Sequence, residues 1–167
     1  MRRSIAILAL ILLVAGCGVR QDEPAWVDSP IASAAPAPTP SALTVAEAGR
    51  RYLEIVAPYN KALEELETAA NDGRSWTTVR ALAARVAETN KSHGLALRST
   101  AWPEEVRTAM ADLVAEIDTA QRYWESAARA KTVDELAGAI RSASRHTGAE
   151  PAGQVRAGLG LPAYSES

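Results

Sequence analysis

From residue 44 onward, apolar residues recur at spacings of three and four, which places them on one face of an α-helix. The first run follows Thr44, which forms the pattern of an N-terminal capping box with Glu47. The run ends at Asn71-Asp72-Gly73, a sequence typical of a turn. The apolar face of this first predicted helix carries Tyr52, Val56, Tyr59, Leu63, Leu66 and Ala70.

Three further segments have the same period and predict three more helices. The second covers about residues 76–97 and the third covers residues 103–127, with Pro103 at a favoured first-turn position. The fourth begins at Thr132, where another capping box occurs, and its apolar positions resume after an interruption to reach Leu159. No segment alternates apolar and polar residues as a half-buried strand does.

Four amphipathic segments joined by short links predict an all-α fold, with residues 44–161 forming an antiparallel up-down four-helix bundle. Two helices are expected to be kinked. Pro58 lies inside the first helix, where it deletes one backbone hydrogen bond, and Pro151 lies inside the last. The pattern leaves open whether Gly148 to Gly153 kinks the last helix or splits it in two.

The first 16 residues have the layout of a secretory signal peptide. Met1-Arg2-Arg3 supplies the positive charge, and the apolar run from Ile5 to Val14 follows it. That run is about half of the roughly 20 residues that a membrane-spanning helix needs. We therefore expect residues 1–16 to be cleaved. The alternatives are an ordinary secretory signal followed by a chance cysteine, and an uncleaved anchor.

The segment Val14-Ala15-Gly16-Cys17 resembles the lipobox of bacterial lipoproteins, and Cys17 is the chain's only cysteine. In that family the cysteine thiol receives a diacylglycerol, signal peptidase II cuts just before it, and the new N-terminus is often acylated, for example with palmitate. The resemblance implies that Cys17 is lipidated and becomes the first residue of the mature protein. It also implies an extracytoplasmic location, with the protein anchored to a membrane of the cell envelope. Two or three acyl chains hold a protein durably at a bilayer, whereas one does not.

Residues 17–43 are expected to form a disordered tether behind the lipidated cysteine. Five prolines with alanine and serine between them give this segment no periodic apolar pattern, so it buries too little surface to offset its ordering entropy. Residues 162–167, after the Gly160-Leu161-Pro162 helix stop, are expected to form a disordered tail.

The helical region also resembles small helical lipoproteins of actinobacterial type. The likeness rests on the stretch Tyr52-Leu53-x-Ile55-Val56-Ala57-Pro58, on the alanine-rich helices and on the ending Leu159-Gly160-Leu161-Pro162. It implies a location and a helical fold, and it implies no particular activity.

Composition and motifs disfavour several functional classes. The formal net charge is −2, and removal of Arg2 and Arg3 with the signal peptide makes the mature chain more acidic, which disfavours nucleic-acid binding. The two histidines, His93 and His146, fall on different predicted helices and in no metal-binding spacing, so no metal or other cofactor is expected. Because no Gly-x-Ser-x-Gly elbow or phosphate-binding loop occurs either, we expect no enzymatic activity.

One group of polar and aromatic residues lies on or beside the predicted apolar faces. Asn90 and His93 fall on the second helix, and a buried amide must be hydrogen-bonded or it costs about 1–3 kcal/mol. The simpler interpretation is that Asn90 sets the helix register. The alternative is a ligand pocket in which Asn90 and His93 are joined by Tyr52, Tyr59 and Trp124.

The sequence therefore supports two hypotheses. In the first, the protein is a non-enzymatic, membrane-anchored envelope lipoprotein whose helical domain docks a protein partner or a cell-wall component. In the second, the domain binds a small apolar or lipid-like ligand between its helices, as helical bundles can.

Overall fold

The computed structural model describes residues 42–163, and this part of the chain is all-α. The predicted signal peptide, the lipobox residues Val14, Ala15 and Gly16, Cys17 and most of the predicted tether lie outside it. The described elements are α1 (Val45–Asn71), α2 (Trp76–Ser99), the 3-10 turn η1 (Glu104–Val106), α3 (Arg107–Arg129), α4 (Val133–Ala143) and α5 (Ala149–Gly158).

The starts of α1 and α4 follow the predicted caps at Thr44 and Thr132, whereas α3 begins at Arg107, after η1, and not at Pro103 as predicted. The Thr44 hydroxyl accepts a hydrogen bond from the Glu47 backbone N–H at 3.3 Å, and the Glu47 carboxylate accepts one from the Thr44 backbone N–H at 3.0 Å. This confirms the capping box, which satisfies two of the backbone donors that a helix N-terminus leaves free. The α1 helix is continuous through Pro58, and the kink expected there stays a prediction.

The last predicted helix is two helices, so five helices occur in the described region where four were expected. The chain leaves α4 after Ala143, and Gly148 has a left-handed φ of 62° just before α5 begins. Pro151 lies in the first turn of α5, where its missing N–H removes no helical hydrogen bond. The expected kink near Pro151 is therefore replaced by a break at residues 144–148.

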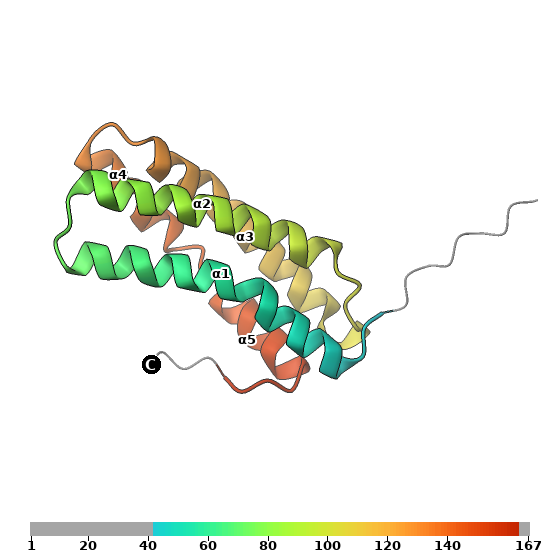
Figure 1. Ribbon diagram of the computed structural model, residues 1–167. Helices are drawn as coiled ribbons and strands as arrows, with labels where there is room; N and C mark the ends of the chain where they lie inside the picture. Colours follow the sequence, from blue (N-terminus) through green and yellow to red (C-terminus); the bar gives the residue numbers. More distant parts are fainter. Residues whose placement is uncertain (1–41, 164–167) are drawn as a thin grey trace, which may run out of the picture. The chain divides into compact units, whose positions relative to one another are not determined.

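Helix packing divides the core into two halves. The packed pairs are α1 with α2, α2 with α3, and α3 with both α4 and α5. One apolar cluster joins the first half of α1 to α5, and it includes Tyr52, Trp102 and Val155. The other joins the second half of α1 to α4, with Leu66 and Leu136 among its members. Figure 1 shows α4 and α5 along different stretches of the three long helices, so each of them completes one half of the core.

Residues on either side of the helical region make contacts with it. Leu43, the last residue of the predicted tether, packs against the first cluster, and its backbone N–H donates to the Ala101 carbonyl at 3.0 Å. At the other end, the Arg156 side chain donates to the Pro162 carbonyl at 2.8 Å. These contacts fix the entry and exit of the chain at the same end as α5.

Two glycines of α5 provide a test of how closely this helix is packed. A Cβ atom on Gly158 would lie 2.6 Å from Cγ1 of the buried Val106, whereas one on Gly153 would meet nothing within 4 Å. We expect Gly158→Ala to lower the free energy of unfolding by about 1–3 kcal/mol through overpacking. Gly153→Ala should instead raise it by about 0.5–1 kcal/mol, because alanine is the better helix former. Urea unfolding followed by circular dichroism measures both, and equal effects of the two changes would show that α5 is not packed against η1 as described.

Candidate ligand-binding cleft

A cleft of about 140 Å³ lies between α1 and α4. It exists because α1 packs against α2 and α4 packs against α3, so that α1 and α4 are not themselves a closely packed pair. Its sides are apolar for most of their length, and hydroxyl groups and one carboxylate stand among them. The lining residues are Tyr59, Leu63, Leu66, Glu67 and Ala70 of α1, Trp124 of α3, and Ile140, Ala143, Ser144 and Thr147 of α4 and the segment after it.

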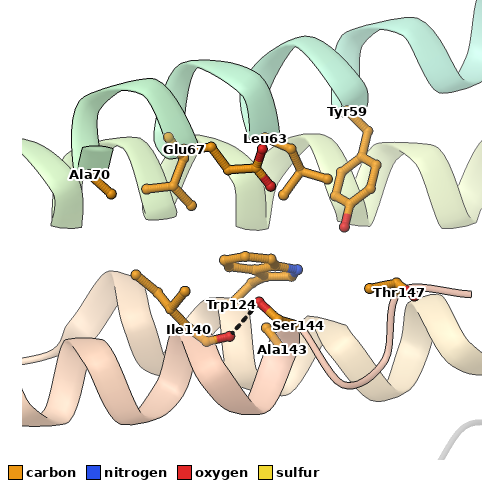
Figure 2. Close-up of a pocket in the computed structure, with 10 residues that line it drawn as sticks. Tyr59, Leu63, Glu67, Ala70, Trp124, Ile140, Ala143, Ser144 and Thr147 are labelled. Atoms are coloured by element: carbon orange, nitrogen blue, oxygen red, sulfur yellow. Dashed lines mark hydrogen bonds between the residues drawn. The ribbon is translucent and has the colours of Figure 1, made fainter. Parts of the chain in front are cut away.

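Trp124 forms the floor of the cleft (Figure 2). Its side chain is only 3% exposed, and it belongs to the apolar cluster that joins α1 to α4. The indole N–H is buried and makes no hydrogen bond to any residue of the described region. Figure 2 shows the indole nitrogen on the side of the ring toward Tyr59. The N–H is near enough to the Tyr59 hydroxyl to oppose the rise in the tyrosine's pKa, although it does not reach hydrogen-bond geometry.

Tyr59, which lines one end of the cleft, forms an aromatic pair with His93, which does not line it. Their rings lie 5.3 Å apart with an angle of 30° between their planes. Burial raises the pKa of Tyr59 to about 12 and lowers the pKa of His93 to about 4. Both groups are therefore neutral at pH 7. Both ring nitrogens of His93 are buried without a hydrogen-bond partner in residues 42–163. Buried polar groups of this kind are rare and costly, and groups with shifted pKa values beside an apolar pocket are typical of binding sites.

Asn90 lies in the interface between α2 and α3 and does not line the cleft. Its amide nitrogen donates to the Ile117 carbonyl at 3.1 Å and to the Gln121 side-chain oxygen at 2.9 Å, while its own oxygen has no partner in the described region. The Gln121 amide in turn donates to Glu125 at 3.0 Å, and this is the largest cause of the lowered pKa of Glu125. These bonds across two helices support the role in helix register that the sequence suggested.

Tyr52 lies in the other half of the core. Its ring packs edge-on against Trp102 at 6.5 Å, and burial raises the pKa of its hydroxyl. Of the five residues proposed from the sequence as ligand contacts, the structure brings Tyr59 and Trp124 into the cleft and packs His93 against Tyr59. It places Asn90 and Tyr52 elsewhere.

Sequence reasoning missed most of the α1 and α4 side of the cleft. Leu63 was recognised as an apolar helix position, but nothing in the sequence showed that it lines a gap together with Ile140. Glu67 gave no signal, because an acidic residue on a helix is usually a solvated surface residue. Ser144 and Thr147 follow the end of α4, in a stretch that was expected from the sequence to be helical.

Other kinds of site find no support in the described part of the chain. Residues 42–163 contain no group of three His, Cys, Asp or Glu side chains that could hold a metal ion. No helix within the same residues is long and apolar enough to cross a membrane. His146 stacks on Tyr123 with ring centres 5.6 Å apart and contacts Glu116 at 3.1 Å.

No protein-family model, curated protein or solved structure matches the chain. Functional inference therefore rests on the cleft and on the N-terminal sequence.

Proposed function

We propose that the protein is a non-enzymatic envelope lipoprotein whose helical domain binds a small, mainly apolar ligand in the cleft between α1 and α4. The observation that supports this most strongly is the cleft itself. It combines an aromatic floor, Trp124, with apolar walls and a polar inner end at Tyr59. A pocket that is mostly apolar, with a few convergent polar groups, is the usual form of a small-molecule site.

The volume of the cleft limits what it can hold. Dry cavities of about 150 Å³ in other proteins bind benzene. A cleft of about 140 Å³ therefore suits one ring or a short branched chain, and the rest of a larger ligand would extend into solvent through the open side. We propose a ligand with one such apolar end group.

The N-terminal sequence supports the proposed location. Lipidation of Cys17 would anchor the domain to the membrane through residues that lie outside the described region, and the tether would let the cleft sample the space near the bilayer. We also propose that α1, α2 and α3 run alternately up and down as three members of a four-helix bundle. In that arrangement α4 and α5 share the fourth position, which fits their separate halves of the core.

Docking of a protein partner or a cell-wall component draws less support from the surface. Interaction surfaces are typically contiguous apolar patches of several hundred Å². The large apolar residues that are exposed in the described region lie on three different helices: Val45 and Leu53 on α1, Leu95 on α2 and Val133 on α4. Single exposed apolar residues of this kind are common on monomeric proteins.

The polar groups at the cleft also favour binding over catalysis. The Ser144 hydroxyl donates to the Ile140 carbonyl at 3.1 Å (Figure 2). Within residues 42–163 it makes no hydrogen bond to a histidine, which is the usual activating base for a serine nucleophile. In the proposed site these hydroxyl groups therefore orient the ligand.

Titration with 2-phenylethanol tests the cleft as a binding site. The full chain, labelled with ¹⁵N in its indole groups and held in a nonionic detergent, gives four indole N–H signals. We expect the Trp124 signal to shift in a saturable manner with a Kd on the order of 1 mM, which corresponds to about −4 kcal/mol. The signals of Trp26, Trp76 and Trp102 should move much less.

A matched pair of variants locates the site. Ala70→Leu narrows the mouth of the cleft from an exposed position of α1 and should weaken binding at least fivefold, whereas Ala57→Leu makes the same change at an exposed α1 position outside the cleft. Absence of a saturable Trp124 shift, or equal effects of the two variants, would remove the cleft as a ligand site.

A further inference from the structure

Charge is distributed unevenly around the cleft. Glu67 is the only charged side chain among its lining residues, and the other polar groups are the neutral hydroxyls of Tyr59, Ser144 and Thr147. Figure 2 shows the Glu67 carboxylate projecting from α1 into the space above the Trp124 indole. The cleft therefore presents a negative charge next to an aromatic ring, with no lining cation to balance it.

The Glu67 carboxylate has no internal partner in the described region. It takes part in none of the ion pairs or hydrogen bonds there, whereas the nearby Glu65 is paired with Arg85 at 2.7 Å. Its charge nevertheless acts on Tyr59, another residue that lines the cleft. Burial is the main cause of the raised pKa of Tyr59, and the Glu67 carboxylate adds to the rise. An unpaired carboxylate that faces an apolar space is available to a ligand.

We propose that the ligand carries a positively charged nitrogen beside its apolar group, so that the site selects small ammonium compounds. This inference rests on the proposed function of the cleft. The apolar group would lie between the apolar walls of the cleft, and the ammonium would lie near the Glu67 carboxylate, over the face of the Trp124 indole ring. Two attractions then act on the same cation, because aromatic rings attract cations at their faces as carboxylates do through their charge.

The same geometry opposes anionic ligands. A fatty acid whose chain entered the cleft would bring its carboxylate toward Glu67, and no lining Lys or Arg would compensate for the repulsion. A neutral alcohol would gain the apolar contacts alone. The affinities of cationic, neutral and anionic ligands should therefore differ because of the charge of the head group, and not because of the size of the ring.

Three probes that share a phenyl ring and differ in head-group charge test this selectivity at pH 7 and low salt. They are 2-phenylethylamine, 2-phenylethanol and 3-phenylpropionate, each titrated into the full chain in nonionic detergent and followed by the Trp124 indole signal. We expect the amine to bind about fivefold more tightly than the alcohol, which is the upper range for an exposed ion pair, and the carboxylate to bind more weakly than the alcohol. Raising the ionic strength to about 1 M should remove most of the amine's advantage.

Glu67→Gln assigns the effect to one side chain. The glutamine variant should bind the amine about fivefold more weakly than the original chain does, and so lose its preference for the amine. Its affinity for the alcohol should stay the same. Glu64→Gln is the matched control, because Glu64 is an exposed acid on the same helix that does not line the cleft. It removes the same charge and should leave all three affinities within about twofold of their original values.

The outcomes separate this inference from the proposed function. If none of the three probes produces a saturable shift of the Trp124 signal, the cleft is not a binding site and both proposals fall. If the alcohol and the carboxylate bind as tightly as the amine, or if Glu67→Gln and Glu64→Gln act alike, the cleft binds ligands but does not select cations. Binding that follows the order amine, alcohol, carboxylate and depends on Glu67 supports both.

Discussion

Replacing His93 by leucine is expected to make the domain less sensitive to acid and at least as stable at pH 7. His93 is 7% exposed, and neither of its ring nitrogens has a hydrogen-bond partner in residues 42–163. Leucine fills a similar space on a buried helix face and carries no polar atoms. Removal of unpaired buried polar groups in favour of apolar ones is close to neutral or stabilising, although the ring contact with Tyr59 is lost.

The acid sensitivity follows from proton binding. Burial, the only cause of the shift, lowers the pKa of His93 from 6.5 to about 4. As the pH falls from about 6.5 to about 4, the unfolded chain therefore takes up a proton at this position and the folded chain does not. The free energy of unfolding falls over this window by about 1.4 kcal/mol per pH unit, or about 3 kcal/mol in all. His93→Leu removes this contribution and leaves the carboxylates to titrate as before.

Urea unfolding at pH 7.0, 6.0 and 5.0 measures the effect as the difference between the variant and the original chain. The difference should grow in favour of His93→Leu by about 2 kcal/mol between pH 7 and pH 5. His146→Gln is the control, because it removes the other histidine from a partly exposed position on Tyr123 and leaves the buried His93 in place. Parallel curves for the original chain and His93→Leu would show that His93 is hydrated or hydrogen-bonded in solution.

The long helices could be predicted from the sequence because the capping residues and the period of the apolar positions indicate the same helices. Thr44 and Ser75 cap α1 and α2, and the apolar positions between the caps and the turns keep the helical period. The last helix could not be predicted because its signals conflict. A stripe of apolar residues continues past Gly148 and Pro151, yet Gly148 adopts the left-handed conformation and Pro151 is well suited to a helix start. Tertiary packing resolved the conflict, since α4 and α5 each cover a different half of the core.

The candidate site was predictable only in part. The stripe of α1 correctly placed Tyr52 and Tyr59 on one face, but seven residues separate them by about 10 Å along the helix axis. That distance puts Tyr52 in one half of the core and Tyr59 in the other. A periodic pattern shows which face of a helix is buried. It does not show which helix lies opposite at a given level, so neither the gap between α1 and α4 nor the exposure of Glu67 to that gap followed from it.

Trp124→Ala is expected to lower the free energy of unfolding by about 3–5 kcal/mol, the usual cost of truncating a buried tryptophan. The ring is 3% exposed, and it lies between α1, α2 and α4 within one apolar cluster. Alanine would remove the floor of the cleft and leave a hole that the three helices cannot close without moving. Urea unfolding at pH 7 measures the loss, and 2-phenylethanol should no longer stabilise the variant.

Substitutions by phenylalanine separate the apolar role of this tryptophan from that of its N–H group. Trp124→Phe keeps an aromatic floor and deletes a buried donor that has no partner in the described region. The free energy of unfolding should therefore fall by no more than about 1.5 kcal/mol. Trp102→Phe makes the same change at a position where the indole N–H donates to the Leu97 carbonyl at 2.6 Å. It should lower the free energy of unfolding by about 1–3 kcal/mol more than Trp124→Phe does, because the buried Leu97 carbonyl loses its hydrogen bond. If Trp124→Phe proves the more damaging of the two, the Trp124 N–H has a partner in solution. A bound polar group at the inner end of the cleft, beside Tyr59, would then be the first place to look for it.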